Sequence, residues 1–274
     1  MVEQLKQKII RKCRAMGVPM VGFASVDRWE HPPFQQWIPE DFRPKSIFPE
    51  AKTVIVLGMP VTLPVVETAP SIAYHQLYKT VNELLDQSTY LLSNYLNGMR
   101  HGSMFVPRDG YGHLSLLKDR PIVFFSHRHA AYLAGLGTFG VNNVLLTREY
   151  GPRVRFGSVF TAAEVDPDPI MEGDLCIRCM RCVEICPVRA IPGQGYPVGL
   201  TDKKACTLRN LELLERHEAP CGLCIKVCPV GEDRELFGRT DMAIYDEGET
   251  DYKALHRAWK HVQSYGSGKR SRPP

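Results

Sequence analysis

The sequence predicts an α+β fold in which a domain of mixed helices and strands precedes a loop-rich, ferredoxin-like module with two [4Fe–4S] clusters. Helix-like and strand-like hydrophobic patterns alternate through residues 1–169, and eight of the nine cysteines fall within residues 176–228. A chain of 274 residues with 44% hydrophobic content can bury one sizeable core and still carry a smaller appended module. We therefore expect three parts, at residues 1–169, 170–240 and 241–274, the last being a helix with a basic tail.

Hydrophobic periodicity predicts the individual elements. Apolar residues repeating at three and four positions predict helices, and short continuous apolar runs predict buried strands. The expected helices are residues 2–16, 71–97, a short helix carrying Tyr132 and Leu133, and residues 250–264. The expected strands are residues 20–24, 53–58, 103–106, 144–147 and 154–161, the last two forming a strand-turn-strand unit around residues 150–152. Residues 28–50 should form an ordered irregular excursion, and residues 266–274 a disordered tail.

The cysteine spacing predicts the two clusters. The first run, Cys176-x2-Cys179-x2-Cys182-x3-Cys186-Pro187, has the bacterial ferredoxin spacing, in which three cysteines bind one [4Fe–4S] cluster and the fourth binds another. The second run is Cys221-x2-Cys224-x3-Cys228-Pro229, and Cys206 precedes it. Each cluster takes four thiolates. The expected ligand sets are Cys176, Cys179, Cys182 and Cys228 for the first cluster, and Cys186, Cys206, Cys221 and Cys224 for the second.

Zinc and disulfides are the alternatives for these cysteines. Structural zinc sites usually show two separated pairs of ligands, whereas these runs are a quartet and a triplet that end in Cys-Pro. Disulfides would need an exported chain, and residues 1–14 carry charges throughout instead of an apolar signal core. The ninth cysteine, Cys13, lies in the first helical segment, where it is expected to be a small buried hydrophobic residue.

Charge and hydropathy limit the partners. The formal charge of +4 counts every thiol as neutral. Two oxidised clusters would add about −4, and +4 − 4 leaves the loaded protein near neutral, so its basic pI is weak evidence for a nucleic-acid partner. No apolar stretch is long enough to span a bilayer, and eight reduced thiols fit a reducing compartment. We expect a soluble cytoplasmic protein without a membrane partner.

A glycine-dense turn is the most distinctive feature of the first domain. Gly135, Gly137 and Gly140 match the letters G-x-G-x-x-G, but the turn follows a helix-like segment and precedes a strand, the reverse of a dinucleotide-binding motif. It is either a tight turn or a place where the backbone closely approaches a large planar cofactor. Four histidines nearby could be metal ligands or unligated surface residues: His101, His113, His127 and His129.

The residues around this turn resemble those of epoxyqueuosine reductases and corrinoid-dependent reductive dehalogenases. The resemblance runs from Ala134-Gly135-Leu136-Gly137 through Gly140-Val141-Asn142-Asn143 to Glu149-Tyr150-Gly151-Pro152-Arg153. The order of the cysteines also matches this superfamily, and Tyr74-His75 resembles an upstream Tyr-His pair of the epoxyqueuosine reductases. The similarity covers about residues 15–235.

This resemblance implies an N-terminal cobalamin-binding domain of nitroreductase-like α/β fold, with the corrinoid between it and the iron–sulfur module. One cluster would lie near the cobalt and the other near the surface, where a ferredoxin or flavodoxin would donate electrons. The implied corrinoid contacts, of which Arg128 aligns with a family arginine, are His75, Arg128, Gly135, Leu136, Gly137, Gly140, Asn142 and Asn143.

The sequence also departs from the family. The aspartate that is the proposed proton donor of epoxyqueuosine reductases falls at Pro121, with Asp119 close by, and the lysine expected after the third glycine is Val141. Dehalogenases use a tyrosine in a comparable upstream helix, so Tyr74 is the first candidate for a proton donor and Asp119 the second. The alternative role for Tyr74 is that of a core aromatic residue.

Three functions follow as hypotheses. The first is a corrinoid and iron–sulfur reductase that acts on a small or nucleoside-like substrate. The second is an electron-transfer protein that reduces a partner, for example a corrinoid protein, without substrate chemistry of its own. The third, modification of transfer RNA, is the least favoured, because the helical-repeat extension of the family is not in this sequence. A flavin is the alternative to cobalamin in the first domain.

Overall fold

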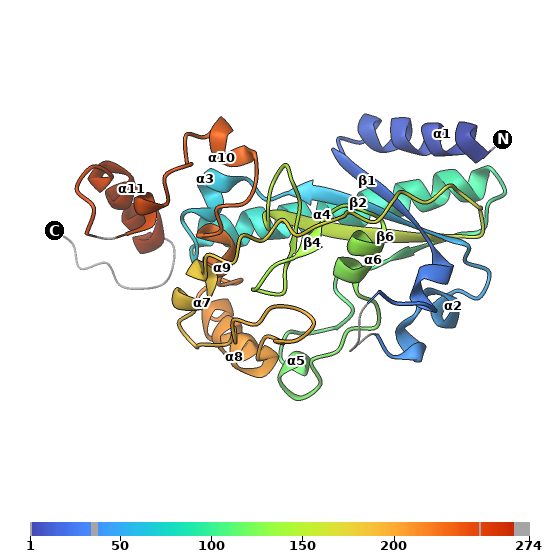
Figure 1. The fold of residues 1–274 in the computed structure, drawn as a ribbon. Helices are drawn as coiled ribbons and strands as arrows, with labels where there is room; N and C mark the ends of the chain where they lie inside the picture. Colours follow the sequence, from blue (N-terminus) through green and yellow to red (C-terminus); the bar gives the residue numbers. More distant parts are fainter. Residues whose placement is uncertain (1, 34–37, 247, 266–274) are drawn as a thin grey trace.

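The fold is built on a four-stranded antiparallel sheet, and the cysteine-rich module lies at one end of it (Figure 1). The computed structural model describes residues 2–33, 38–246 and 248–265. The tail predicted to be disordered, residues 266–274, and residues 34–37 of the predicted irregular excursion lie outside the described residues. No helix in the described part is long and apolar enough to cross a membrane.

The elements follow the predicted order closely. The strands are β1 (Met20–Ser25), β2 (Thr53–Pro60), β3 (Ser103–Val106), β4 (Thr138–Phe139), β5 (Leu145–Leu146) and β6 (Val154–Thr161). The helices are α1 (Val2–Ala15), α2 (Pro44–Ile47), α3 (Leu63–Val66), α4 (Ile72–Gly98), α5 (Leu116–Asp119), α6 (His127–Leu133), α7 (Arg181–Glu184), α8 (Lys203–Leu214), α9 (Leu223–Lys226), α10 (Asp233–Leu236) and α11 (Lys253–Ser264). Short 3-10 helices are η1 (Val26–Trp29), η2 (Glu40–Phe42) and η3 (Met242–Tyr245).

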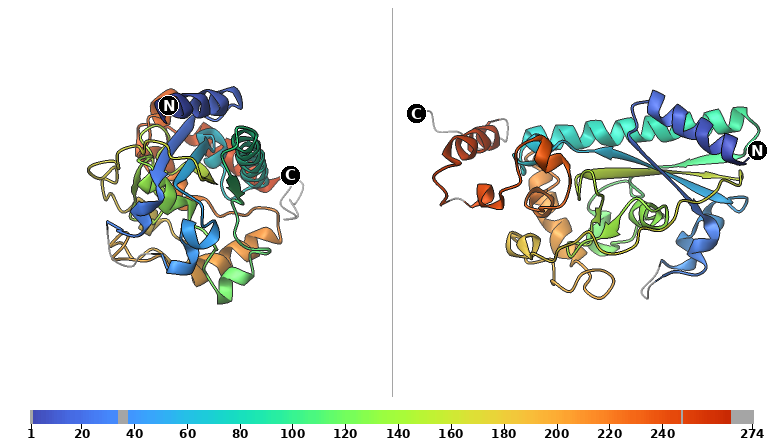
Figure 2. Two further views of the ribbon diagram at one scale, coloured as in Figure 1. Left: turned by 90° about the vertical axis from the view of Figure 1, so that its right-hand side faces the viewer. Right: turned by 45° about the horizontal axis from the view of Figure 1, so that its top comes forward.

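The central strands β2 and β6 are buried on both faces, and the sequence of β2 is accordingly a nearly continuous apolar run. The strand order is β1-β2-β6-β3, with Ile55 opposite Val159 in the register. Ile55 and Val159 point into the layer formed by α1 and α4, whereas Val54 and Phe160 point into the opposite layer, which contains α6. Figure 2 shows the long helix α4 running along the sheet beside α1.

Helix α4 matches the prediction for residues 71–97 closely. Ser71 caps its N-terminus by accepting a hydrogen bond from the backbone N–H of Tyr74 at 3.1 Å. Helix α4 lies so close to β6 that a Cβ on Gly157 would be 2.9 Å from Thr89 Cγ2. One apolar face of the helix covers the sheet. The N-terminal end of α4 reaches the cysteine-rich module. Its buried apolar residues are Tyr74, Val81, Leu85, Leu92 and Leu96.

The two strands predicted on either side of residues 150–152 are present as β5 and β6, and they lie in different sheets. The strand β5 pairs with β4 in a separate two-stranded sheet, whereas β6 pairs with β2 and β3. The residues of β6 are almost all buried at the centre of the main sheet, a position that the two residues of β5 are too short to share.

A buried ion pair fastens β6 to the cysteine-rich module. Arg153, at the entrance to β6, donates through Nε to Asp233 Oδ2 at 2.7 Å and through Nη2 to Asp233 Oδ1 at 2.5 Å. The same guanidinium donates to the carbonyls of Val230 at 2.7 Å and Cys228 at 3.2 Å. The two side chains are 0% and 6% exposed. This arrangement fixes the backbone next to Cys228 relative to the sheet.

The C-terminal segment packs back onto the module and the start of α4. Tyr245 stacks on Trp259 of α11 with ring centroids 5.7 Å apart, and Lys226 Nζ lies 4.6 Å from the Trp259 ring centroid. The buried carboxylate of Glu67 accepts hydrogen bonds from Arg239 at 3.0 Å and from the Tyr245 hydroxyl at 2.9 Å. The predicted helix at residues 250–264 is confirmed as α11.

Candidate iron–sulfur site

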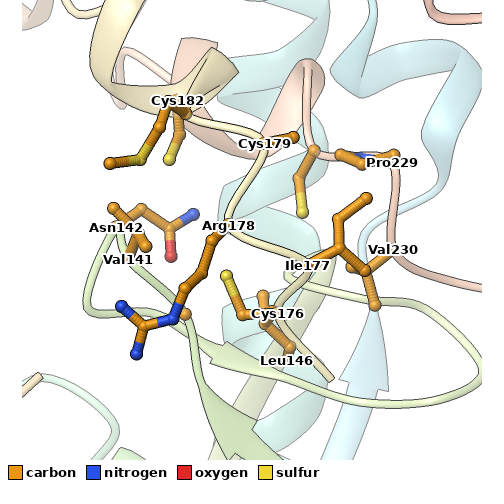
Figure 3. A pocket seen from close by; sticks show the side chains of 13 residues that line it. Val141, Asn142, Leu146, Cys176, Ile177, Arg178, Cys179, Cys182, Pro229 and Val230 are labelled. Atoms are coloured by element: carbon orange, nitrogen blue, oxygen red, sulfur yellow. The ribbon is translucent and has the colours of Figure 1, made fainter. Parts of the chain in front are cut away.

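The first predicted ligand set surrounds a single pocket. Cys176, Cys179, Cys182 and Cys228 all line it, together with residues 140–142 of the glycine turn. Figure 3 shows Cys176, Cys179 and Cys182 arranged around the hollow, with Pro229 and Val230 contributed by a second segment. The structure therefore brings Cys228 from the second run to the three cysteines of the first run.

Both cysteine runs use the same local turn. In each run a residue with a left-handed backbone follows one cysteine and begins a one-turn helix that contains the next. Met180, with φ 62°, precedes α7, and Gly222, with φ 72°, precedes α9. The helices α7 and α9 contact each other. This repeated turn places two thiols of each run on the inside of a loop.

The second predicted ligand set gathers beside α8. Asn210 connects two of its members: its Nδ2 donates to the carbonyl of Cys206 at 2.8 Å and to the sulfur at 3.5 Å, and its Oδ1 accepts from the backbone N–H of Cys221 at 2.8 Å. The sulfur of Cys186 accepts a hydrogen bond from the backbone N–H of Ala190 at 3.2 Å. Burial, followed by the nearby Cys221 and Cys186 thiols, raises the pKa of Cys206.

The nine cysteines form no disulfide in the structure. Among the residues described by the structure, no three His, Cys, Asp or Glu side chains are close enough to hold a single metal ion. An iron–sulfur cube binds each thiolate at a different corner, so its ligands stand further apart than those of one ion. Cys13 is fully buried in the core, and burial raises its pKa to about 12, as expected of a thiol that acts as a small hydrophobic residue.

Tyr74 lies where the second cysteine set meets α4. It is only 2% exposed, and its ring packs against Gly222, between Cys221 and Cys224. Burial is the largest cause of its raised pKa, and Tyr78 and the two cysteines add to the shift. The hydroxyl therefore stays protonated at ordinary pH. Tyr74 is a buried aromatic residue, which is the alternative role expected from the sequence. It is also a neighbour of the proposed second cluster.

Replacing Gly222 with alanine is expected to loosen this contact. A Cβ at residue 222 would lie 2.5 Å from Tyr74 Cε1, and the left-handed backbone costs a non-glycine residue about 1–2 kcal/mol. We expect Gly222→Ala to lower the thermal unfolding temperature and to speed iron loss to a chelator. Gly98→Ala is the matched control, because nothing lies within 4 Å of a Cβ there. Equal iron loss from both variants would contradict the predicted role of this contact.

A polar cluster extends from Tyr74 along α4 to β6. The rings of Tyr74 and Tyr78 meet edge to face at 6.4 Å, and the Arg155 guanidinium lies 4.5 Å from the Tyr78 ring centroid. Arg155 donates to Asn82 Oδ1 at 3.0 Å and pairs with Asp109 at 3.6 Å. The site residues predicted from the sequence did not include Tyr78, Asn82, Asp109 or Arg155. The spacing of four between Tyr74 and Tyr78 could have indicated a shared helix face, but nothing in the sequence indicates that Arg155 meets them.

The glycine turn is packed against the protein itself. A Cβ on Gly137 would lie 1.9 Å from the Leu146 carbonyl oxygen, and one on Gly135 would lie 2.1 Å from the Pro169 carbonyl oxygen. These two glycines are required for close approach of the chain's own backbone, as in a tight turn. Their contact with a cofactor stays a prediction. Gly140 differs, because it lines the pocket of the first cysteine set.

The other predicted cofactor contacts make hydrogen bonds within the chain. His75 Nδ1 bonds to the carbonyl of Ala219, and Asn143 Oδ1 accepts from the backbone N–H of Thr201 at 2.8 Å. Arg128 donates to the Asn143 carbonyl, and burial lowers its pKa. The remaining two are Leu136, which packs in the α6 layer, and Asn142, which lines the first pocket. The second candidate proton donor, Asp119, is exposed on α5.

The metal-ligand interpretation of the histidines is wrong for the described residues. His127 bonds to Ser158 Oγ at 2.9 Å and to the Pro107 carbonyl at 3.1 Å, and His129 bonds to the Tyr196 hydroxyl at 2.7 Å. Burial lowers the pKa of His127 to about 4 and that of His129 to about 3. Both are therefore neutral buried residues, so the alternative that fits them is an unligated histidine and not a surface one.

Comparison with known proteins supports the predicted resemblance. The family described as a 4Fe-4S dicluster domain matches residues 175–232. Epoxyqueuosine reductase of Gloeobacter violaceus is 25% identical over 237 residues, which cover 80% of this chain and 66% of that protein. Epoxyqueuosine reductase of Bacillus cereus is 25% identical over 272 residues, covering 88% of this chain and 68% of that protein.

The chain is similar to epoxyqueuosine reductases over most of its length. A tetrachloroethene reductive dehalogenase of Dehalobacter restrictus is 32% identical over 114 residues, or 36% of this chain and 21% of that protein. The chain spans between 58% and 68% of the length of the curated epoxyqueuosine reductases it matches. The matched dicluster domain contains all eight predicted ligand cysteines.

Solved structures share the fold. A structure of epoxyqueuosine reductase with a transfer-RNA stem loop superimposes with a TM-score of 0.57 at 19% identity, covering 97% of this chain and 78% of that one. A catabolic reductive dehalogenase superimposes with a TM-score of 0.60 at 18% identity, covering 91% of this chain and 35% of that one. The mixed helix-and-sheet fold with an iron–sulfur domain, predicted from the sequence, is therefore confirmed.

Proposed function

We propose that the protein is an iron–sulfur reductase that passes electrons through two [4Fe–4S] clusters to an acceptor bound near the start of α4. The observation that carries the proposal is the grouping of the eight cysteines. Cys176, Cys179, Cys182 and Cys228 line one pocket, and the other set lies beside Tyr74 of α4. Thiolates in two sets of four suit two clusters, which supply one-electron transfer when bound. The second set is Cys186, Cys206, Cys221 and Cys224.

We propose cobalamin as the acceptor, with a flavin as the alternative. The supporting observation is the polar cluster formed by Tyr78, Asp109 and Arg155, which offers both hydrogen-bond donors and acceptors to an amide-fringed group. A solved reductive dehalogenase that superimposes with a TM-score of 0.58 is described as carrying out B12-dependent dehalogenation. The nitroreductase-like character of the first domain and its boundary at residue 169 belong to the same proposal.

The proposed substrate is a small or nucleoside-like organic molecule, and the proposed electron donor is a ferredoxin or flavodoxin in the cytoplasm. The nucleoside class follows from the relatives named epoxyqueuosine reductase, and one of them is solved with a transfer-RNA stem loop. Whether this chain acts on transfer RNA itself is tested by binding a stem loop at two salt concentrations, since phosphate contacts weaken as salt rises.

The decisive experiment is cofactor analysis of protein purified without oxygen. The proposal expects about eight iron atoms per chain, and cobalamin bound with a base-off spectrum after reconstitution. Iron near eight with neither cobalamin nor flavin retained would overturn the proposed acceptor while leaving the clusters in place. Iron near four, or zinc in its place, would overturn the cluster assignment.

Tyr74 is the proposed proton donor, because its neutral hydroxyl lies between the second cysteine set and the polar cluster on α4. We expect Tyr74→Phe to retain iron and cofactor but to lower the rate of substrate reduction by a factor of about 100. Tyr90→Phe, an exposed tyrosine on the same helix, is the control. Full activity of Tyr74→Phe would transfer the role to the second candidate, Asp119, although Asp119 is exposed on α5.

An electron-transfer protein without substrate chemistry is the second candidate function. It is favoured by the exposed position of Cys179, beside Ile177, which is 68% exposed. An apolar surface next to a cluster ligand suits contact with another redox protein. Reduction of epoxyqueuosine or of an organohalide by the purified protein and a chemical reductant would exclude this candidate.

A further inference from the structure

Hydrogen-bond donors surround the second cysteine set, although binding iron does not by itself require them. Cys206, Arg209 and Asn210 are spaced three and four residues apart on α8, so they share one face of the helix. Asn210 donates to the Cys206 sulfur at 3.5 Å and accepts a hydrogen bond from the backbone N–H of Cys221 at 2.8 Å. One amide thus connects two predicted ligands that come from separate parts of the chain.

Arg209 adds a positive charge at the same place. Its Nη1 pairs with Glu212 at 3.1 Å, but that carboxylate is 66% exposed, so water screens the pair. Its Nε is buried and has no hydrogen-bond partner among the described residues. A buried donor without an acceptor is costly in a folded protein, and a negatively charged group beside it would remove that cost.

The Arg209 guanidinium also acts on Cys221. The Arg209 side chain contacts the Cys221 thiol, so its positive charge lies beside a predicted ligand of the second cluster.

We propose that Arg209 and Asn210 are positioning residues that raise the reduction potential of the second cluster relative to its value without them. Reduction adds one negative charge to a cluster, and hydrogen-bond donors and cations near its sulfurs stabilise that charge. Asn210 supplies an N–H dipole at Cys206, and Arg209 supplies a cation near Cys221. The inference rests on the assignment of the second cluster to Cys186, Cys206, Cys221 and Cys224.

The test is an anaerobic redox titration of the reconstituted protein, followed by electron paramagnetic resonance. Cys206→Ser identifies which of the two signals belongs to the second cluster. Asn210→Asp keeps the oxygen that accepts from Cys221 but loses the N–H at Cys206 and adds a negative charge. Arg209→Gln removes the cation and leaves all three hydrogen bonds of Asn210 in place.

Each variant is expected to lower the ratio of reduced to oxidised second cluster about tenfold at a fixed potential, or about 59 mV for a one-electron couple. The first cluster should shift less. Arg11→Gln, the same charge change on exposed helix α1, is the control and should move neither potential. If Asn210→Asp loses the second cluster, the reduction potential of that cluster in Arg209→Gln alone decides whether the inference holds.

Unchanged potentials in variants with full iron content would overturn the inference, as would equal shifts of both clusters. Iron content near four in the unaltered protein would instead contradict the proposed function. Failure to find cobalamin or a substrate has no effect on the measured potentials, so the two proposals fail separately.

Discussion

Cys224→Ala is expected to halve the iron content of the anaerobically purified protein, from about eight atoms to about four per chain. Cys224 is surrounded by thiols: burial, followed by Cys221, Cys206, Cys182 and Cys186, raises its pKa. Loss of one of four ligands from the buried cluster should also abolish electron delivery to the α4 side, since Tyr74 contacts that cluster's loop. Iron analysis and electron paramagnetic resonance measure both effects.

Cys13→Ala provides the control, because Cys13 is the one cysteine outside both predicted ligand sets and is buried in the apolar core. It should retain the full iron content and both signals. An intact second signal in Cys224→Ala, or a loss of iron in Cys13→Ala, would contradict the ligand assignment.

Arg153→Met is expected to lower the free energy of unfolding by about 3–5 kcal/mol, because it leaves the buried Asp233 carboxylate without a partner. The variant also loses the hydrogen bond to the Cys228 carbonyl, so the first cluster should become more accessible to chelators. Anaerobic urea unfolding, followed by circular dichroism and by cluster absorbance, measures the two effects.

Two comparisons separate the buried charge from general damage. The double variant Arg153→Met with Asp233→Leu should recover part of the lost stability, since no unpaired charge remains. Lys52→Met breaks an exposed pair, Lys52–Glu164 at 3.9 Å, and should change stability by less than about 1 kcal/mol. A similar loss in Lys52→Met and Arg153→Met would show that burial of the pair is unimportant.

The cysteine runs could be predicted well from sequence because their spacing encodes local turns. The turns before α7 and α9 depend on residues within three positions of each other, so sequence neighbours determine them. The long helix α4 and the buried strand β2 were also predictable, because each is long enough to show a clear hydrophobic period.

Contacts between distant segments could not be predicted. The pairing of β6 with β2 rather than with β5 depends on which strand the sheet can bury, and Arg155 meets Tyr78 only after that pairing. Gly135 and Gly137 had a correct local interpretation as a turn, but only the position of the Leu146 and Pro169 carbonyls shows why glycine is needed there.

The position of Cys228 in the pocket of the first run has a consequence for how the protein matures. In the proposed ligand assignment each cluster draws ligands from both runs, so neither would be completed from the part of the chain that is synthesised first. Cys176, Cys179 and Cys182 must wait until residue 228 has left the ribosome, whereas the sheet, made from residues 20–161, can fold earlier. Insertion of both clusters is thus expected as a late, joint event on a preformed scaffold.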